Sequence, residues 1–364
     1  MRVVVLPGVR IVRRILSQRV STSIGLNKEY GRCGQPDHET GDAYHRAMLT
    51  VTELEPTEIR RAHAEIAAVF RDAPQFVHDG LSSRLGVAVI VKVETTNPIR
   101  SFKGRGTWVA VHALAAAGSI DPDRPVICAS AGNFGQGVAY AARTLGIPAL
   151  VFASRRANRA KVARMRALGA EVVEVGEDFD AARAASEAHV AGRPGHLLVD
   201  GDDVRISTGA ATLALEITDA AEAGLLPSPA VVSVPVGNGA LINGVGSWLR
   251  AMAPGCRVLG VQAEGAAAMT LSWRAGRAID TPVVATYADG IASRIAIPAA
   301  VELMTGRVDE MRIVSDDALR AAQAELTEEL GITVEGAAAA SWAGLLDGPR
   351  PDGPAVLIVT GSNV

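Results

Sequence analysis

Apolar residues along this chain follow two alternating patterns: short β-branched runs, and longer stretches in which apolar positions recur every three or four residues. The first pattern is typical of strands buried on both faces of a sheet, and the second of helices with one buried face. The run at residues 126–129 and the Ala-rich stretch at residues 134–145 form one such unit. Because these units repeat in strand-helix order, the sequence predicts parallel sheets joined by helical crossovers.

The predicted elements cover the chain from about Glu55 onward. Strands are expected at residues 87–91, 126–129, 149–152, 172–175, 197–199, 230–236, 258–262, 311–314 and 355–359. Helices are expected at residues 104–117, 134–145, 160–165, 178–191, 208–223 and 241–252, and another is expected to start at residues 315–317. A first helix from Pro56 is expected to bury one apolar face, formed by Ile59, Ala62, Ile66, Val69 and Phe70. We therefore predict an α/β protein with two parallel sheets and a cleft between them.

Three parts of the chain are expected. Residues 1–48 turn polar and lose the periodic pattern, so we expect an N-terminal arm outside the fold that is poorly ordered. Residues 124–203 are expected to form a small domain. Residues 49–123 together with 204–364 are expected to form a large domain. In such folds ligands bind at the carboxyl ends of strands, which places the predicted site in the cleft.

Composition excludes several classes of function. The chain has 364 residues with a formal net charge of -3, which gives no indication of nucleic acid or an anionic membrane surface as a partner. No apolar run is long enough to span a bilayer. The three cysteines, Cys33, Cys128 and Cys256, lie far apart and lack metal-ligand spacing. This cysteine usage predicts a reducing compartment, the cytoplasm, with no disulfide framework and no zinc site.

Lysine is rare in this chain, and one lysine stands in an unusual context. Of 36 basic residues only four are lysines, namely Lys28, Lys92, Lys103 and Lys161. Lys103 lies in the segment Ser-Phe-Lys-Gly-Arg-Gly at residues 101–106. A lysine amine can form a Schiff base once its pKa falls, whereas an arginine guanidinium stays protonated. The motif alone fits either a solvated loop lysine or a reactive amine.

Three further polar turns each follow a predicted strand. Residues 130–137 read Ser-Ala-Gly-Asn-Phe-Gly-Gln-Gly, and their N–H groups at a helix start suit a carboxylate. Residues 237–240 read Gly-Asn-Gly-Ala, and a helix N-terminus of this kind suits a phosphate. Residues 360–363 read Thr-Gly-Ser-Asn and place hydroxyls at a strand end. Taken singly, each of them also fits an ordinary turn or a polar chain end.

Taken in order, these segments resemble the fold-type II family of pyridoxal-phosphate (PLP) enzymes, specifically the threonine/serine dehydratases. The resemblance runs from about Glu55 to the end of the chain, and further segments at residues 260–265, 287–292 and 331–335 are similar to family motifs. It implies a two-domain, tryptophan synthase β-like fold with the active site in the cleft between domains. It also implies PLP as cofactor, a small amino acid as substrate and a homodimeric assembly.

The resemblance assigns roles residue by residue. Lys103 matches the Schiff-base lysine and thus the catalytic residue. The implied cofactor-binding residues are Lys103, Phe102, Asn133, Gly237, Asn238, Gly239, Ala240, Leu241 and Thr360. The implied substrate-binding residues, in the carboxylate loop of the small domain, are Ser130, Ala131, Gly132, Asn133 and Gln136. Some members hold a monovalent or divalent cation, and the matching positions here are Glu264 and Ala268.

The chain departs from the family pattern at three places: the phosphate turn, Phe134 and Thr360. The phosphate turn has Asn238 and Ala240 where the family has glycines, and Phe134 replaces a histidine. Thr360 stands where a serine is usual, as it does in threonine synthases. Serine racemases carry a second acid/base serine at the position of Ala131, so racemisation is not expected as the main activity. The departures bear on the substrate more than on the cofactor.

The expected function is a PLP-dependent β-elimination that converts a hydroxy-amino acid such as L-threonine or L-serine into a 2-oxo acid and ammonia. Two alternatives stay open at this point. One is a β- or γ-replacement enzyme of the threonine-synthase type, which Thr360 and Asn238 favour. The other is a PLP-binding protein without catalytic activity, against which the intact Lys103 motif and its two flanking turns stand.

Overall fold

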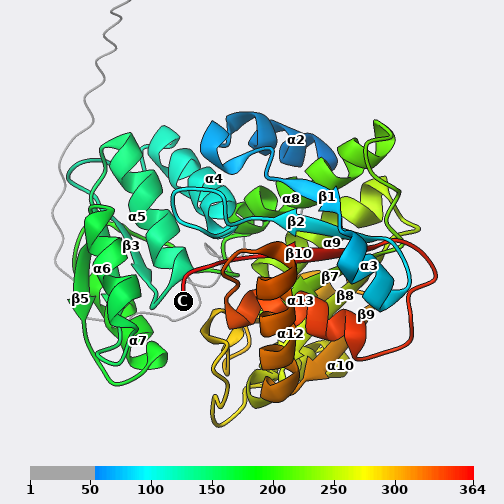
Figure 1. The fold of residues 1–364 in the computed structure, drawn as a ribbon. Coiled ribbons are helices and arrows are strands. Elements are labelled where there is room, and N and C mark those ends of the chain that lie inside the picture. Colours follow the sequence, from blue (N-terminus) through cyan, green and yellow to red (C-terminus); the bar gives the residue numbers. More distant parts are fainter. Residues whose placement is uncertain (1–53) are drawn as a thin grey trace, which may run out of the picture. The chain divides into compact units, whose positions relative to one another are not determined.

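The computed structural model describes residues 54–364, which contain two sheets flanked by helices (Figure 1). One sheet has six strands in the order β1-β2-β10-β7-β8-β9, and the other has four in the order β5-β4-β3-β6. All neighbouring strands pair in parallel except β1 with β2. The predicted α/β architecture is therefore confirmed, while the predicted arm at residues 1–48 lies outside the described residues.

Most predicted elements are present with small shifts at their ends. The strands are β1 (Gln75–Val77), β2 (Val89–Val93), β3 (Val126–Ala129), β4 (Ala149–Ala153), β5 (Glu171–Glu174), β6 (His196–Leu197), β7 (Val231–Pro235), β8 (Arg257–Ala263), β9 (Glu310–Val314) and β10 (Ala355–Val359). The helices are α2 (Pro56–Glu65), α3 (Asp79–Leu85), α4 (Lys103–Ala116), α5 (Asn133–Leu145), α6 (Arg159–Ala167), α7 (Phe179–Val190), α8 (Val204–Glu222), α9 (Ala240–Met252), α10 (Ala268–Ala275), α11 (Pro298–Met304), α12 (Asp316–Leu330) and α13 (Gly336–Leu346). Short 3-10 turns are η2 (Ala68–Phe70), η3 (Glu264–Ala266) and η4 (Asp289–Ile291).

Alternate side chains of the six-stranded sheet pack into two different cores. In β10, Leu357 faces the core formed with α3, α12 and α13, while Ile358 faces the core formed with α2, α8, α9 and α11. In β2, Val91 and Ile90 divide in the same way. Successive side chains of a strand point to opposite faces, so a strand covered on both faces has to be apolar throughout. This explains the uninterrupted β-branched runs in the sequence.

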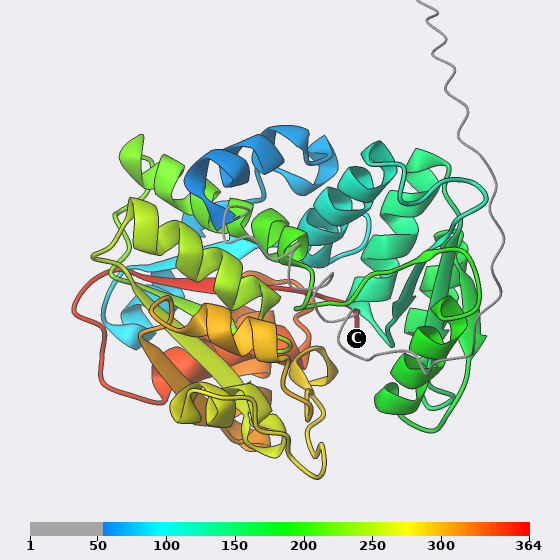
Figure 2. The same cartoon turned by 180° about the vertical axis from the view of Figure 1, so that it is seen from behind.

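The four-stranded sheet comes entirely from residues 126–197, within the predicted small domain, and is also covered on both faces. Its strands with α5 and α6, drawn in green, lie on the left of Figure 1 and on the right in the reverse view of Figure 2. Cys128 and Val151 pack with α4, α5 and α6, whereas Ile127 and Phe152 pack against α7. Helix α4 thus packs in the core of the four-stranded sheet, although it follows β2 of the six-stranded sheet in the sequence.

Two predictions about helices need correction. Val69 was expected on the buried face of the first helix, but α2 ends at Glu65 and Val69 is 47% exposed, because η2 changes the phase of the side chains. Helix α8 begins at Val204 rather than at residue 208, since the Asp203 carboxylate accepts a hydrogen bond from the N–H of Arg205 and caps it. Among residues 54–364, no helix is long and apolar enough to cross a bilayer.

The last strand determines where the site forms. Strand β10 lies between β2 and β7, so the carboxyl ends of three strands from distant parts of the chain meet at one edge. The segment after β10 continues beside the one before α4, where the N–H of Phe102 donates to the carbonyl of Thr360 at 3.0 Å. Ser101 and Gly361 form a bridge there as well. The predicted lysine motif and the predicted C-terminal turn are therefore direct neighbours.

Candidate active site

Segments from both sheets line one cavity of about 740 Å³. From the larger sheet come the lysine motif after β2, the turn after β7 and Thr360 after β10. From the smaller sheet come the loop after β3 and the turn after β6, which carries Asp200. Because these are the carboxyl ends of parallel strands, the cavity lies where such sheets bind ligands. Four of the five segments were singled out in the sequence, and Asp200 was not.

Lys103 extends its amine into this cavity from the first position of α4. Its Nζ donates to Asp200 Oδ2 at 2.6 Å, and the side chains are 15% and 14% exposed. The amine also lies over the rings of Phe102 and Phe134, with centroids at 4.9 and 5.8 Å. The residue that replaces the family's histidine thus contributes an aromatic wall beside the lysine. One aspartate and two rings surround an amine that water reaches only partly.

The turn at residues 237–240 presents free backbone donors at the start of α9. The N–H groups from Gly237 to Leu241 have no acceptor within the described part of the chain. Only Gly239 has a left-handed backbone, with φ of +94°, so Asn238 and Ala240 occupy the turn without strain. A helix N-terminus with several unpaired N–H groups binds an anionic group such as a phosphate. The two departures from the glycine pattern therefore leave a usable phosphate turn.

Thr360 also lines this cavity. It is 3% exposed, and its hydroxyl has no hydrogen-bond partner among residues 54–364. Its carbonyl accepts from Phe102, which leaves the hydroxyl as the polar group that Thr360 offers to a ligand. A hydroxyl both donates and accepts, so it suits a ring nitrogen in either protonation state. The Lys103 amine, the free N–H groups of residues 237–241 and the Thr360 hydroxyl together fit the aldehyde, phosphate and ring nitrogen of PLP.

The predicted carboxylate loop is held in shape by its own serine. Ser130 Oγ accepts from the N–H groups of Gly132 and Gly135, at 3.2 and 2.9 Å. Asn133 donates through Nδ2 to Glu335 at 2.8 Å, and its Oδ1 accepts from Asn363. Ser130, Ala131, Gly132 and Asn133 all line the cavity. In this structure the Asn133 amide is bound to protein groups on both sides, and its contact with a cofactor stays a prediction.

Three predicted site residues lie apart from this cavity. Gln136 is fully buried in α5, where its Oε1 accepts from Arg164. Glu264 is exposed at the end of β8, and the Ala268 carbonyl accepts from the Ser272 hydroxyl at 2.7 Å. The described residues that could together hold a metal ion do not include Glu264. A substrate role for Gln136 and the cation at Glu264 and Ala268 remain predictions without support from this arrangement.

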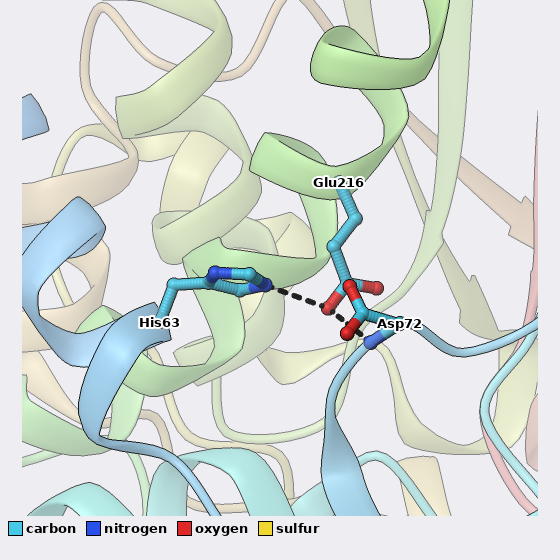
Figure 3. A group of neighbouring side chains, drawn as sticks. All are labelled: His63, Asp72 and Glu216. Atoms are coloured by element: carbon cyan, nitrogen blue, oxygen red, sulfur yellow. Dashed lines mark hydrogen bonds and ion pairs between the residues drawn. The ribbon is translucent and has the colours of Figure 1, made fainter. Parts of the chain in front are cut away.

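The cluster that does have metal-like spacing is formed by His63, Asp72 and Glu216 (Figure 3). Glu216 Oε1 accepts from His63 Nε2 at 3.2 Å and from the main-chain N–H of Asp72 at 2.9 Å. The same carboxylate also accepts from Arg105 and Lys92. Since its oxygens are already bound by positive groups, we assign this cluster a structural role and no metal.

These contacts belong to a buried network centred on Arg105, two residues after Lys103. Its guanidinium makes bidentate pairs with Glu94, at 2.8 and 2.9 Å, and with Glu216, at 2.7 and 2.8 Å. Nη1 also donates to Thr212, so all five N–H groups are used. Burial alone would lower the pKa of Arg105, but the two carboxylates outweigh it and raise the pKa. The network joins α4 to β2 and α8 and thereby fixes the start of α4.

Glu335 is a second buried acid that faces the cavity. It caps α13, is 4% exposed, and its Oε2 has no partner in the described part of the chain. Burial, with some contribution from Asp289, raises the pKa of this carboxyl to about 7, although the Lys161 ammonium opposes the shift. Folding therefore shifts this carboxyl toward its neutral form, which predominates below about pH 7.

We expect Glu335→Gln to stabilise the cofactor-free protein at pH 8. A raised carboxyl pKa contributes stability in full below the unfolded value near 4.5, and the contribution is lost as pH rises through about 7. Glutamine keeps the acceptor for Asn133 but carries no charge, so it should add on the order of 3 kcal/mol at pH 8 and almost nothing at pH 4. Urea unfolding at several pH values gives the free energy of unfolding of each protein as a function of pH. If the difference between the two proteins were the same at pH 4 and pH 8, the raised pKa would be contradicted.

The comparisons with known proteins agree with this geometry. Residues 68–361 match the family described as pyridoxal-phosphate dependent enzymes. The chain is 36% identical over 286 residues to L-threonine ammonia-lyase of Thermotoga maritima, covering 78% of this chain and 69% of that protein. It is 35% identical over 311 residues to phenylserine dehydratase of Ralstonia pickettii, covering 83% and 90%. The processed threonine deaminase isoform 2 from Solanum lycopersicum superposes with a TM-score of 0.76 at 29% identity, covering 85% of this chain and 91% of that one.

Proposed function

The chain belongs to the pyridoxal-phosphate dependent enzymes, and on this premise we propose that it is an ammonia-lyase acting on a hydroxy-amino acid of the threonine or serine kind. The observation that carries the proposal is the convergence of Lys103 Nζ, the free N–H groups of residues 237–241 and the Thr360 hydroxyl on one cavity. The names of the similar proteins, threonine ammonia-lyase and phenylserine dehydratase, support elimination over replacement.

The residues divide the work of holding the cofactor. Lys103 would hold its aldehyde carbon, the N–H groups at the start of α9 its phosphate, and Thr360 its ring nitrogen. When bound, PLP supplies a ring that draws electrons from the α-carbon of an attached amino acid. The neutral hydroxyl of Thr360 gives up no proton to the ring as a carboxylic acid would. This limits charge storage in the ring and favours prompt loss of a β-leaving group.

Lys103 has a second task once the substrate amine has replaced its own. Its free amine would remove the α-proton, for which it must be neutral and close to the α-carbon. The aromatic walls of Phe102 and Phe134 and the partial burial of Nζ limit water at this point. Among the described residues, the N–H groups of Ala131 and Asn133 have no acceptor. They would orient the substrate carboxylate, so that the α-C–H bond stands in the reactive direction.

Three finer statements are also proposals. Assembly as a homodimer is supported by the resemblance and by apolar side chains on the edge strand β1, where Phe76 and Val77 are 41% and 38% exposed. Light scattering with chromatography tests it. A cytoplasmic location rests on the cysteine usage of the sequence. A cation at Glu264 and Ala268 rests on the resemblance alone, and activity after chelation and re-addition of cations tests it.

A panel of amino acids tests the proposed reaction. The PLP-loaded protein should release a 2-oxo acid and ammonia from at least one of L-threonine, L-serine and phenylserine. Release of a product from phosphohomoserine instead would favour a replacement enzyme of the threonine-synthase type. A protein that gains no visible absorbance with added PLP would contradict the cofactor assignment and every reaction built on it.

A further inference from the structure

Asp200 has an incomplete set of partners in the cavity. Its Oδ2 accepts from Lys103 Nζ, whereas its Oδ1 is buried and has no hydrogen-bond partner in residues 54–364. The Cys128 thiol is close enough to be affected, since its pKa is raised by burial and then by the Asp200 carboxylate. A neutral thiol offers no compensating charge, so within residues 54–364 Lys103 is the only cation paired with this carboxylate.

The other basic side chains that line the cavity are already matched with acids. The pairs are Lys161 with Asp289, Arg294 with Asp180 and Arg183 with Glu187. None of them is free to neutralise Asp200 when Lys103 changes state. A carboxylate that is only 14% exposed is destabilised when its cationic partner is withdrawn, until another donor reaches it.

Use of the site changes the state of Lys103. An ammonium group has three N–H donors and a positive charge. A lysine nitrogen bonded to a carbonyl carbon keeps at most one N–H, and a lysine amine that acts as a free base is neutral. At that stage Asp200 has lost its ammonium partner, and the substrate amino acid is bound beside the same lysine. A donor on the substrate can then take the place of the ammonium group.

Resting on the proposed function, we propose that Asp200 determines substrate specificity by binding the β-substituent, and that it favours a cationic β-ammonium group over a β-hydroxyl group. Both substituents donate hydrogen bonds. Only the ammonium group also replaces the positive charge that Asp200 loses when Lys103 becomes a neutral amine. At hydrogen-bonding distance in a partly buried site, a carboxylate attracts an ammonium group more strongly than a neutral hydroxyl group. The same carboxylate would repel an acidic β-substituent.

The added activity is ammonia elimination from a 2,3-diamino acid. The α-C–H bond breaks and its proton goes to Lys103 Nζ, while the Cβ–N bond breaks with its electron pair on nitrogen, which leaves as ammonia. One water then replaces the remaining amino nitrogen. Thus 2,3-diaminopropionate and one water give pyruvate and two ammonia molecules, with no oxidant or reductant.

A matched pair of unreactive ligands isolates the recognition step. 2-Methylserine and 2,3-diamino-2-methylpropionate lack an α-proton, so elimination cannot start, and they differ only in the β-substituent. Calorimetry and the absorbance change of the PLP-loaded protein give both dissociation constants. The wild type should bind the diamino compound at least about tenfold more tightly, after desolvation is subtracted from the charge attraction. Asp200→Asn should reduce this ratio to near one.

Asp289→Asn serves as the control, because it removes another lysine-paired carboxylate from the cavity without touching Lys103. It should keep the wild-type ratio. A wild type without preference, or an Asp200→Asn protein that keeps it, would overturn the inference. If Asp200→Asn does not fold, Asp200→Ser takes its place and should likewise bring the ratio of the two dissociation constants to near one. The ratio measured for the wild type tests the inference without any variant. Turnover of serine or threonine without the diamino preference would leave the proposed function standing, whereas absence of PLP binding would end both.

Discussion

Lys103→Ala should abolish 2-oxo acid release by the PLP-loaded protein, with a loss of at least about 10³-fold in kcat. The variant removes both the amine that would hold the cofactor and the base for the α-proton. It should also lose the visible absorbance that the wild type gains with PLP. Stopped assays for 2-oxo acid and an absorbance titration measure the two effects separately.

Two control variants make this result specific. Lys103→Arg keeps a positive charge near Asp200 but cannot form the covalent bond, so it should be as inactive as alanine. Lys161 is the second lysine that lines the cavity, with its Nζ 2.5 Å from Asp289. Lys161→Ala should keep the visible absorbance. Borohydride reduction followed by peptide mass analysis should place the cofactor on Lys103; an adduct on Lys161 would contradict the assignment.

Glu216→Gln should destabilise the protein by about 3–5 kcal/mol, because it breaks a buried charge network on one side. The carboxylate binds Arg105 twice and Lys92 at 2.5 Å, with both basic side chains fully buried. Glutamine keeps an acceptor for His63 but turns an amide N–H₂ toward groups that only donate. Urea unfolding of the cofactor-free protein measures the change through the midpoint at constant slope.

Comparison with other variants shows whether the buried charge is the cause. Glu310→Gln removes a carboxylate that also pairs with two arginines but is 32% exposed, and it should cost less than about 1 kcal/mol. Burial lowers the pKa of Lys92, so this ammonium is the weaker partner. Lys92→Met added to Glu216→Gln should recover part of the loss. Equal costs for Glu216→Gln and Glu310→Gln would contradict the account.

Local patterns predicted most of the fold because each strand and helix is specified by neighbouring residues. The runs at residues 126–129 and 355–359 appear as strands with the same bounds. Helix α13 was missed because ten of its eleven residues, from Gly336 to Leu345, are buried, so it has no polar face to give a helical period. The end of α2 was also missed, since η2 follows it without a glycine or proline.

The sequence singled out those cavity-lining residues that stand in a distinctive local segment. It missed those whose position in the cavity depends on contacts between distant residues. Lys103 was identified by the rarity of lysine, and the turns at residues 130–137 and 237–240 by their glycines. Asp200 has no such mark, because an aspartate after a strand is common. Its partner is 97 residues away, and Arg105 and Glu216 are 111 residues apart.

The sequence by itself determined the alternating architecture, and it singled out Lys103 and the two turns for which we propose Schiff-base, carboxylate and phosphate roles. These follow from hydrophobic period and backbone freedom, which act over a few residues. Only the tertiary structure decided that β10 lies between β2 and β7 and that Asp200 shares a cavity with Lys103. It also decided that Glu216 serves the buried network and that burial raises the pKa of Glu335. Pairing, burial and charge compensation depend on which distant segments meet, and no local pattern carries that information.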